Sequence, residues 1–243
     1  ISASYAQIIE LFPSGGGGYV VASKLLGPSA GLVSGSALVI DYILTVAISI
    51  AAAADAIFSN LPPAWAGHKM ITVLSLTFAL IWLNMRGIKE SIKILLPIFL
   101  VFVFCHLILI IAGLAPHITA LPTIFSGAAT ETREMVHGPD GLWGFLVLLF
   151  TAYSLGGGTY TGIEAVANGM GNLAEPRART GKRTMLYMSL SLAFTAAGIL
   201  FCYMLWATPD LPGKTMNATL IDQVMAHWHW AGIPYGKGLA NVT

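Results

Sequence analysis

Long apolar runs, separated by short polar segments, make up most of the chain. A helix needs about 20 mostly apolar residues to cross the hydrocarbon core of a bilayer. The pattern therefore predicts an all-α, polytopic membrane protein with a single transmembrane domain over residues 1–243. The predicted spans are residues 31–58, 68–86, 91–115, 142–172 and 184–206, preceded by the end of a span at 1–12 and a surface helix at 18–27. Residues 115–141 are predicted to form a polar loop.

The span at 142–172 is interrupted by three consecutive glycines, which include Gly157 and Gly158. Each glycine weakens a helix by about 1 kcal/mol relative to alanine and permits backbone conformations that other residues resist. In a membrane, such opened backbone is tolerated only where it lines a protein cavity. We therefore predict a broken helix whose carbonyl groups, together with Thr159 and Thr161, bind a substrate or an ion. The alternative is a glycine-rich face that packs against a neighbouring helix.

The span at 31–58 carries a carboxylate, Asp41, far from both of its ends. A carboxylate at that depth costs about 2.5–3.5 kcal/mol on insertion scales, which makes it a candidate for function. Thr45 follows on the same helical face, and Tyr42 lies beside that face. Such an all-oxygen lining suits a hard cation or a substrate ammonium group. A structural aspartate that is hydrogen-bonded to a neighbouring helix remains the alternative.

Just beyond the glycine break, Glu164 follows Thr161 by three residues, so both are expected on one side of the second half-helix. Glu164 is a candidate for carrying a coupled proton. The alternative is that its carboxylate caps the N-terminus of the second half-helix, where the helix dipole favours negative charge. The two roles are compatible, and both remain open.

The composition supports a membrane protein and disfavours several other classes. The chain is 56% hydrophobic and 9% charged, whereas soluble domains carry about 25% charged residues. A net charge of +1 gives no indication of nucleic-acid binding. We find no nucleophile–base set and no metal-ligating constellation, so neither an enzyme nor a cofactor is expected.

Lysine and arginine are distributed unevenly among the connecting segments, and the richer set is expected on the cytoplasmic side. This predicts a multi-pass protein of the plasma membrane, with cytoplasmic loops near residue 24 and at 86–93 and 173–183, and with an extracellular loop at 207–243. The poorer set carries Lys69, Arg133, Lys214 and Lys237. The richer set carries Lys24, Arg86, Lys89, Lys93, Arg177, Arg179, Lys182 and Arg183.

Several stretches resemble the amino acid–polyamine–cation (APC) transporter superfamily. The longest is SYAQIIELFPSGGGGYVVASKLLGPSAGLVSGSALVIDYILTVAISIAAAADAI, which is similar to the second and third helices of the superfamily. The others are LNMRGIKES, and TGIEAVANG with the basic loop EPRARTGKR. The resemblance implies the inverted-repeat (5+5) fold of the APC and LeuT type, of which the sequence would hold the end of helix two through helix seven. It therefore implies an incomplete transport domain that lacks the first helix.

Within the superfamily, the Asp41–Tyr42 pair with Thr45, and Thr161 with Glu164, most resemble the KimA-type potassium importers. The resemblance implies potassium sites lined by the aspartate, the tyrosine and the threonines, and transport coupled to protons. The expected function is proton-coupled import of potassium by alternating access. An amino acid or polyamine permease on the same scaffold is the alternative, and a channel or structural membrane subunit is a further class. The expected partners are K⁺ and H⁺ or an amino acid, and the lipid bilayer, with a homodimer left open.

Overall fold

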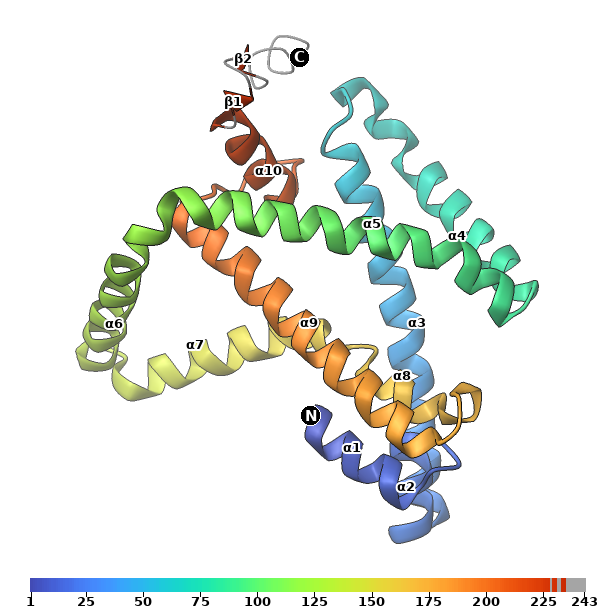
Figure 1. Ribbon diagram of the computed structural model, residues 1–243. Coiled ribbons are helices and arrows are strands. Elements are labelled where there is room, and N and C mark those ends of the chain that lie inside the picture. Colours follow the sequence, from blue (N-terminus) through green and yellow to red (C-terminus); the bar gives the residue numbers. More distant parts are fainter. Residues whose placement is uncertain (228, 231–232, 235–243) are drawn as a thin grey trace. The chain divides into compact units, whose positions relative to one another are not determined.

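The structure of the chain is a computed structural model that describes residues 1–227, 229–230 and 233–234. Apart from a two-residue antiparallel strand pair, the described elements are helices (Figure 1). In chain order they are α1 Ser2–Leu11, α2 Gly17–Leu25, α3 Pro28–Phe58, η1 Pro63–His68, α4 Lys69–Met85, α5 Ile88–Leu114, η2 Ala115–Ala120, α6 Leu121–His137, α7 Gly141–Gly156, η3 Gly157–Tyr160, α8 Ile163–Asn168, η4 Met170–Asn172, α9 Arg177–Leu205, α10 Met216–His227, β1 His229–Trp230 and β2 Ile233–Pro234.

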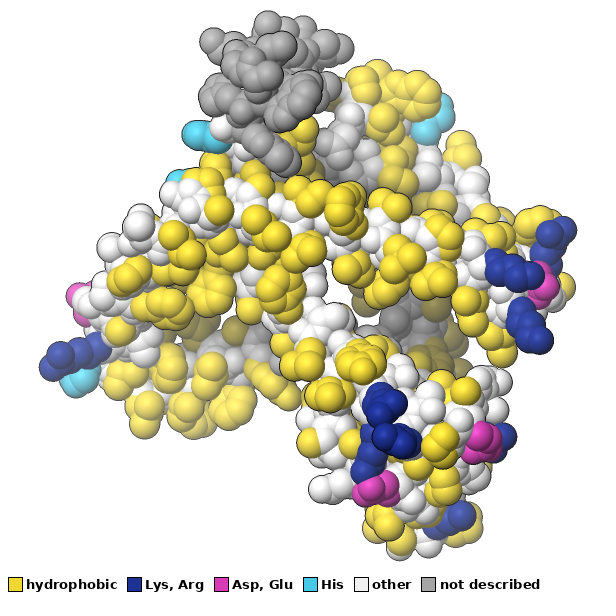
Figure 2. All heavy atoms as spheres, in the orientation of Figure 1, with side chains coloured by type: hydrophobic (Ala, Val, Ile, Leu, Met, Phe, Trp, Pro, Cys, Tyr) yellow, Lys and Arg dark blue, Asp and Glu magenta, His cyan; other side chains and the backbone are white. Residues whose placement is uncertain are grey.

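Several helices have the length and composition of membrane spans. Within the described residues, four stretches are long and apolar enough to cross a membrane, namely Pro28–Phe58, Pro63–Met85, Ile88–His137 and Arg177–Leu205. Helix α7 is shorter and also apolar. Many large apolar side chains along these helices are exposed, and Figure 2 shows them covering much of one face. An extensive apolar exterior is typical of a surface that contacts lipid or other helices. The predicted all-α, polytopic membrane class is confirmed.

The contacts divide the chain into two units, which are described separately here. Unit 1 comprises Ile1–Ala47 and Arg133–Ala196, and unit 2 comprises Ile48–Thr132 and Ala197–Thr243. Helices α3, α6 and α9 each contribute residues to both units. Unit 1 contains α1, α2, α7 and α8, whereas unit 2 contains α4, α5 and α10.

Unit 1 has a small core formed by α1, α8, η4 and α9. Helix α9 approaches η4 closely at Gly181, where a Cβ atom would lie 2.7 Å from the Met170 sulfur. Lys182 of α9 also forms an ion pair with Glu10 of α1. These contacts hold the second half of the broken helix against α1 and α9. The buried core residues are Ile9, Ile163, Ala167, Met170 and Met185.

Unit 2 has its core where α5, α9 and α10 meet, and glycines bring α5 and α9 together. A Cβ atom on Gly113 would lie 2.7 Å from the Cys202 sulfur. A Cβ atom on Gly198 would lie 2.8 Å from Ile110 Cδ1. Trp206 donates from its indole nitrogen to the Gly113 carbonyl oxygen at 2.9 Å. Close approach at small residues is a common way to pack helices within a membrane. The buried residues of this core are Cys202, Leu220 and Val224.

The prediction of a polar loop at 115–141 is wrong, because η2 and α6 make the chain helical from Ala115 to His137. Leu121 and Phe125 lie one helical turn apart and therefore share a face. The Phe125 ring packs edge-to-face against Phe201 of α9, with ring centroids 5.6 Å apart. This segment is an amphipathic helix with one apolar side. Its many polar residues led to the prediction of a loop, although its apolar residues recur with the period of a helix.

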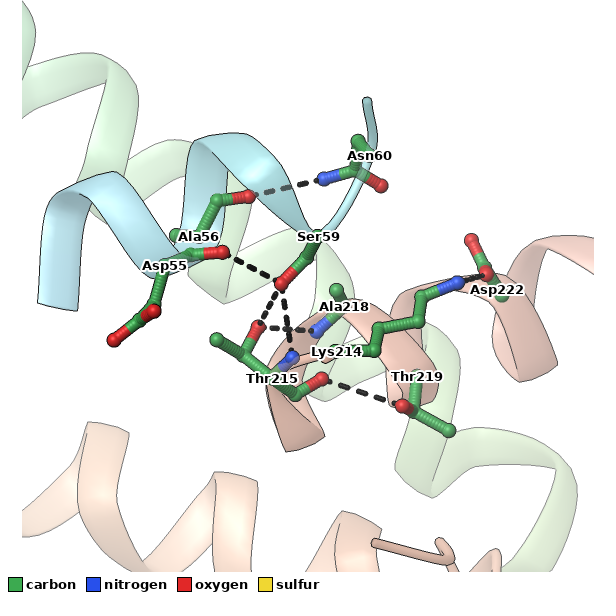
Figure 3. Close-up of polar contacts among 9 residues, drawn as sticks. All are labelled: Asp55, Ala56, Ser59, Asn60, Lys214, Thr215, Ala218, Thr219 and Asp222. Atoms are coloured by element: carbon green, nitrogen blue, oxygen red, sulfur yellow. Dashed lines mark hydrogen bonds and ion pairs between the residues drawn. The ribbon is translucent and has the colours of Figure 1, made fainter. Parts of the chain in front are cut away.

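A polar network joins the C-terminal end of α3 to the start of α10 within unit 2 (Figure 3). The Ser59 hydroxyl donates to the Asp55 carbonyl oxygen at 2.7 Å and accepts a hydrogen bond from the Thr215 backbone nitrogen at 2.9 Å. Thr215 in turn caps α10, because its hydroxyl accepts a hydrogen bond from the Ala218 nitrogen at 3.3 Å. The side chain of Asp55 forms an ion pair with Lys69.

Candidate functional site

The break in the helix lies at the glycines, between α7 and α8. Helix α7 ends at Gly156, η3 takes the chain through Gly157 and Gly158, and Thr161 is extended with φ −61° and ψ 133°. Gly162 then has φ +102°, a left-handed conformation that glycine adopts without the steric cost paid by other residues. Helix α8 begins directly after it. The glycines therefore both end the first half-helix and form the turn after which the second half-helix begins.

Four of the residues selected from the sequence line one cavity of unit 1, with a volume of about 390 Å³. They are Asp41 of α3, and Gly157, Thr161 and Glu164 of the broken helix. The cavity brings a carboxylate from the middle of one helix to the break in another, although more than 100 residues of sequence separate them. Its other lining residues are Ile1, Tyr5, Gly18, Tyr19, Ser34, Ala37, Leu38 and Asn168.

Glu164 lies in the first turn of α8, and its carboxylate caps this turn. The backbone N–H of Gly162 donates to both carboxylate oxygens, each at 3.1 Å. A negative charge at a helix N-terminus is favoured by the helix dipole and by the unpaired N–H groups there. The capping arrangement considered from the sequence is therefore present. Glu164 also lines the cavity, so the same carboxylate is available to a ligand or a proton.

Tyr42 is held beside the cavity by a residue of α8. The Asn168 side-chain nitrogen donates to the Tyr42 hydroxyl oxygen at 2.7 Å. Asn168 lines the cavity, whereas Tyr42 is half-buried next to Asp41. The phenol oxygen of Tyr42 keeps a lone pair beyond the one that accepts this hydrogen bond.

Besides Tyr42, two described residues of the predicted site, Thr45 and Gly158, are not among those that line the cavity. Thr45 is half-buried on α3, one helical turn beyond Asp41. Gly158 is exposed, and a Cβ atom built on it would meet no other atom within 4 Å. The side chain of Thr159 lies outside the described part of the structure. Their roles remain predictions.

Asn168, Tyr5 and Tyr19 also line the cavity, although none of them was predicted from the sequence. A signal for Asn168 was available, because it follows Glu164 by one helical turn and therefore shares its face. No comparable signal existed for the two tyrosines. They reach the cavity from α1 and α2 through packing between helices, which the helical period of one segment does not reveal.

The chemistry of the cavity suits a small cation. Its described lining carries two carboxylates, from Asp41 and Glu164, and no lysine or arginine. Hydroxyl groups come from Tyr5, Tyr19, Ser34 and Thr161. Oxygen ligands of this kind are preferred by hard cations. Within the described residues, no group of three or more His, Cys, Asp and Glu side chains lies close enough to hold a resident metal ion.

Comparison with known proteins identifies the family. A family model for amino acid permeases matches residues 1–230. The chain belongs to the amino acid permease family. The chain is also 36% identical over 224 residues to the potassium transporter KimA of Bacillus subtilis (strain 168), an alignment that covers 90% of the chain. The predicted superfamily and the likeness to KimA are confirmed, and the protein is a multi-pass membrane protein.

The chain spans 35% of the length of KimA.

Proposed function

We propose that this permease imports potassium across the plasma membrane by alternating access, driven in part by protons. The observation that carries the proposal is the cavity at the helix break, where Asp41, Thr161 and Glu164 line the same space. The similarity to a protein named as a potassium transporter supports potassium as the substrate. We assign no enzymatic activity to the chain.

In the proposed mechanism, Asp41 supplies the negative charge that replaces part of the hydration energy of the cation. At 4 Å and an effective dielectric constant of 20, two unit charges attract by about 4 kcal/mol. The hydroxyl oxygens of Tyr42, Thr45 and Thr161 act as neutral ligands, with the backbone and hydroxyl groups of residues 157–159 at the break. An ion that has lost part of its hydration shell can then bind at these oxygen ligands.

Glu164 carries the coupled proton in this mechanism. Its carboxylate lies at the start of α8, so protonation would weaken the charge-assisted contact with the Gly162 N–H. The position of the second half-helix would in this way respond to the proton. Moving one positive charge inward at 100 mV, inside negative, contributes about 2.3 kcal/mol, and a proton adds to this driving force.

The proposed orientation follows the distribution of basic residues. The loops near residue 24 and at 86–93 and 173–183 would face the cytoplasm, and 207–243 would face outward. Glu164 then lies on the cytoplasmic side of the break. A homodimer is an assembly compatible with this proposal, and nothing in the mechanism requires it.

The direct test is growth of bacteria that lack their own potassium uptake systems, at limiting potassium, with the permease expressed from its complete reading frame. Wild type is expected to restore growth and Asp41→Asn to fail, since the loss of even 1.4 kcal/mol of binding lowers affinity about tenfold. The matched control is Asp55→Asn on the same helix. Asp55 is a half-buried member of an ion pair near the end of α3, away from the cavity, and ion pairs that remain partly in solvent contribute little. Equal rescue by wild type and Asp41→Asn would contradict the proposal.

An amino acid permease is the second candidate, because the matching family model carries that description. The broken-helix backbone would then bind a substrate carboxylate, and Asp41 the ammonium group. Uptake of radiolabelled amino acids by wild type, without rescue of potassium-limited growth, would favour this candidate. Flux that ignores the pH gradient and far exceeds transporter rates would instead indicate a channel.

A further inference from the structure

Asn168, at the C-terminal end of α8, is where three helices of unit 1 meet. Its side-chain nitrogen donates to the Tyr42 hydroxyl of α3 at 2.7 Å. Exchange of the amide oxygen and nitrogen would keep this contact, because a phenol can both donate and accept. The hydrogen bond links the second half of the broken helix to the helix that carries Asp41.

The other side of the same amide faces the glycine-rich turn that precedes α2. A Cβ atom on Gly17 would lie 2.3 Å from the Asn168 side-chain oxygen. A Cβ atom on Gly15 would lie 3.1 Å from the Asn168 backbone oxygen. Both glycines are buried and have positive φ, +46° and +92° respectively. The turn therefore accommodates Asn168 only because it lacks side chains there.

The Asn168 side-chain oxygen is shielded from solvent and has no hydrogen-bond partner among the described residues. An unpaired buried polar atom costs free energy, so such groups in proteins usually have a reason to be retained. An apolar residue of similar size would avoid this cost but would lose the bond to Tyr42. The bond to Tyr42 is the feature that an amide supplies here and a leucine cannot.

Asn168 also lies in the wall between two cavities of unit 1. It lines the cavity that holds Asp41 and Glu164, and also a second, mostly apolar cavity of about 720 Å³ along α2 and α3. Tyr19 and Leu38 are shared by both linings in the same way. Any movement of α8 away from α3 must break the Asn168–Tyr42 bond and open this wall.

We propose that Asn168 is a positioning residue of the transport site. Its amide orients the Tyr42 hydroxyl at the cavity and fixes the second half of the broken helix to α3 and to the glycine turn. The identity of the bound ion is taken from the proposed function, whereas the Asn168–Tyr42 hydrogen bond does not depend on it. The inference predicts that substitutions of Asn168 and of Tyr42 have non-additive effects on the affinity for the substrate.

The test is a double-mutant cycle with Asn168→Leu and Tyr42→Phe, singly and together, in the protein expressed from its complete reading frame. Rubidium uptake gives KM and the maximal rate per molecule in the membrane, and the purified protein gives Tm. Each single variant is expected to raise KM about three- to tenfold, the size of one hydrogen bond. The double variant should be no worse than Tyr42→Phe alone, because Asn168 acts through the hydroxyl that Tyr42→Phe removes.

Asn168→Ala is a second variant that removes the whole amide without introducing a large apolar side chain, in case leucine impairs folding. It should raise KM like Asn168→Leu while the protein reaches the membrane in wild-type amounts. The matched control is Asn172→Leu, an exposed asparagine four residues further on, which should leave KM unchanged.

Additive effects in the double variant, in KM and in Tm, would overturn the inference. So would an unchanged KM in the Asn168 variants. If wild type itself takes up no rubidium, the proposed function fails, and the inference is then decided by Tm alone. Non-additive Tm shifts for Asn168 and Tyr42 would support it in that case, and additive shifts would reject it.

Discussion

At the scale of single residues, Glu164 has an observed contact and a proposed role, and the two make different demands on its side chain. Its carboxylate caps α8 through the Gly162 N–H, and it also faces the cavity that contains Asp41. A purely structural cap needs a hydrogen-bond acceptor but no titratable group. A proton carrier needs a titratable group in contact with the ion path. A substitution that keeps the acceptor and removes the titration separates the two roles.

Glu164→Gln is that substitution, because the amide oxygen can still accept the Gly162 N–H. If Glu164 carries the proton, uptake by the variant should lose its stimulation by an inward proton gradient while the protein remains folded. Wild-type uptake should rise as the external pH falls, and uptake by the variant should be flat over the same range. The measurement is rubidium uptake against external pH in membrane vesicles at fixed membrane potential.

Glu164→Ala serves as the comparison, because it removes both the acceptor and the charge. It should lower Tm in addition, since loss of a helix cap costs about 1 kcal/mol. A Glu164→Gln variant that keeps the full pH response of wild type would leave Glu164 as a structural cap only.

At the scale of helices, the sequence allowed the broken helix and the Asp41 face to be predicted because both depend on local chemistry. Consecutive glycines weaken a helix, and a carboxylate inside an apolar run is visible by inspection. Helix α6 was missed because its polar composition outweighed its helical period. Asn168 and the tyrosines of the cavity were missed because their roles arise from contacts between segments far apart in sequence, which no local pattern encodes.

The packing of α5 against α9 gives a prediction at the same scale. Gly198 is buried, and a Cβ atom there would lie 2.8–3.0 Å from three carbon atoms of the Ile110 side chain. Gly198→Ala should therefore push the two helices apart and lower Tm, because overpacking costs about 1–3 kcal/mol. The measurement is thermal unfolding of the purified protein in detergent.

Gly127→Ala on α6 is the matched control for Gly198→Ala. Gly127 is exposed, and a Cβ atom there would meet no other atom within 4 Å. Since alanine favours a helix by about 1 kcal/mol over glycine, this variant should hold or raise Tm. Equal Tm values for the two variants would mean that α5 and α9 do not pack closely at Gly198.

At the scale of the whole molecule, the apolar exterior and the placement of charge define how the chain meets the bilayer. Large side chains along α5, such as Ile98, Phe104 and Ile111, are more than half exposed. Charged side chains gather in a few places on the face shown in Figure 2, and long apolar stretches separate them. Because a buried charge in lipid is costly, each charged group marks a place where the chain meets water or protein.

The topology proposed from the basic residues can be tested with single cysteines on a background in which Cys105 and Cys202 are replaced by serine. Glu90→Cys lies in the basic segment at 86–93 and is exposed, and it removes no positive charge. Ala66→Cys lies in η1, at the opposite end of α4. An impermeant maleimide should label Ala66→Cys in intact cells, and Glu90→Cys only after the membrane is opened.

Each position is the control for the other. Both are exposed, and α4 connects their segments, so they are expected on opposite sides of the membrane. Labelling of Glu90→Cys from outside would invert the orientation. Glu164 would then lie on the outer side of the break, and a proton from outside would enter the site from the side on which α8 lies. The assigned direction of import therefore depends on this measurement as much as on the chemistry of the cavity.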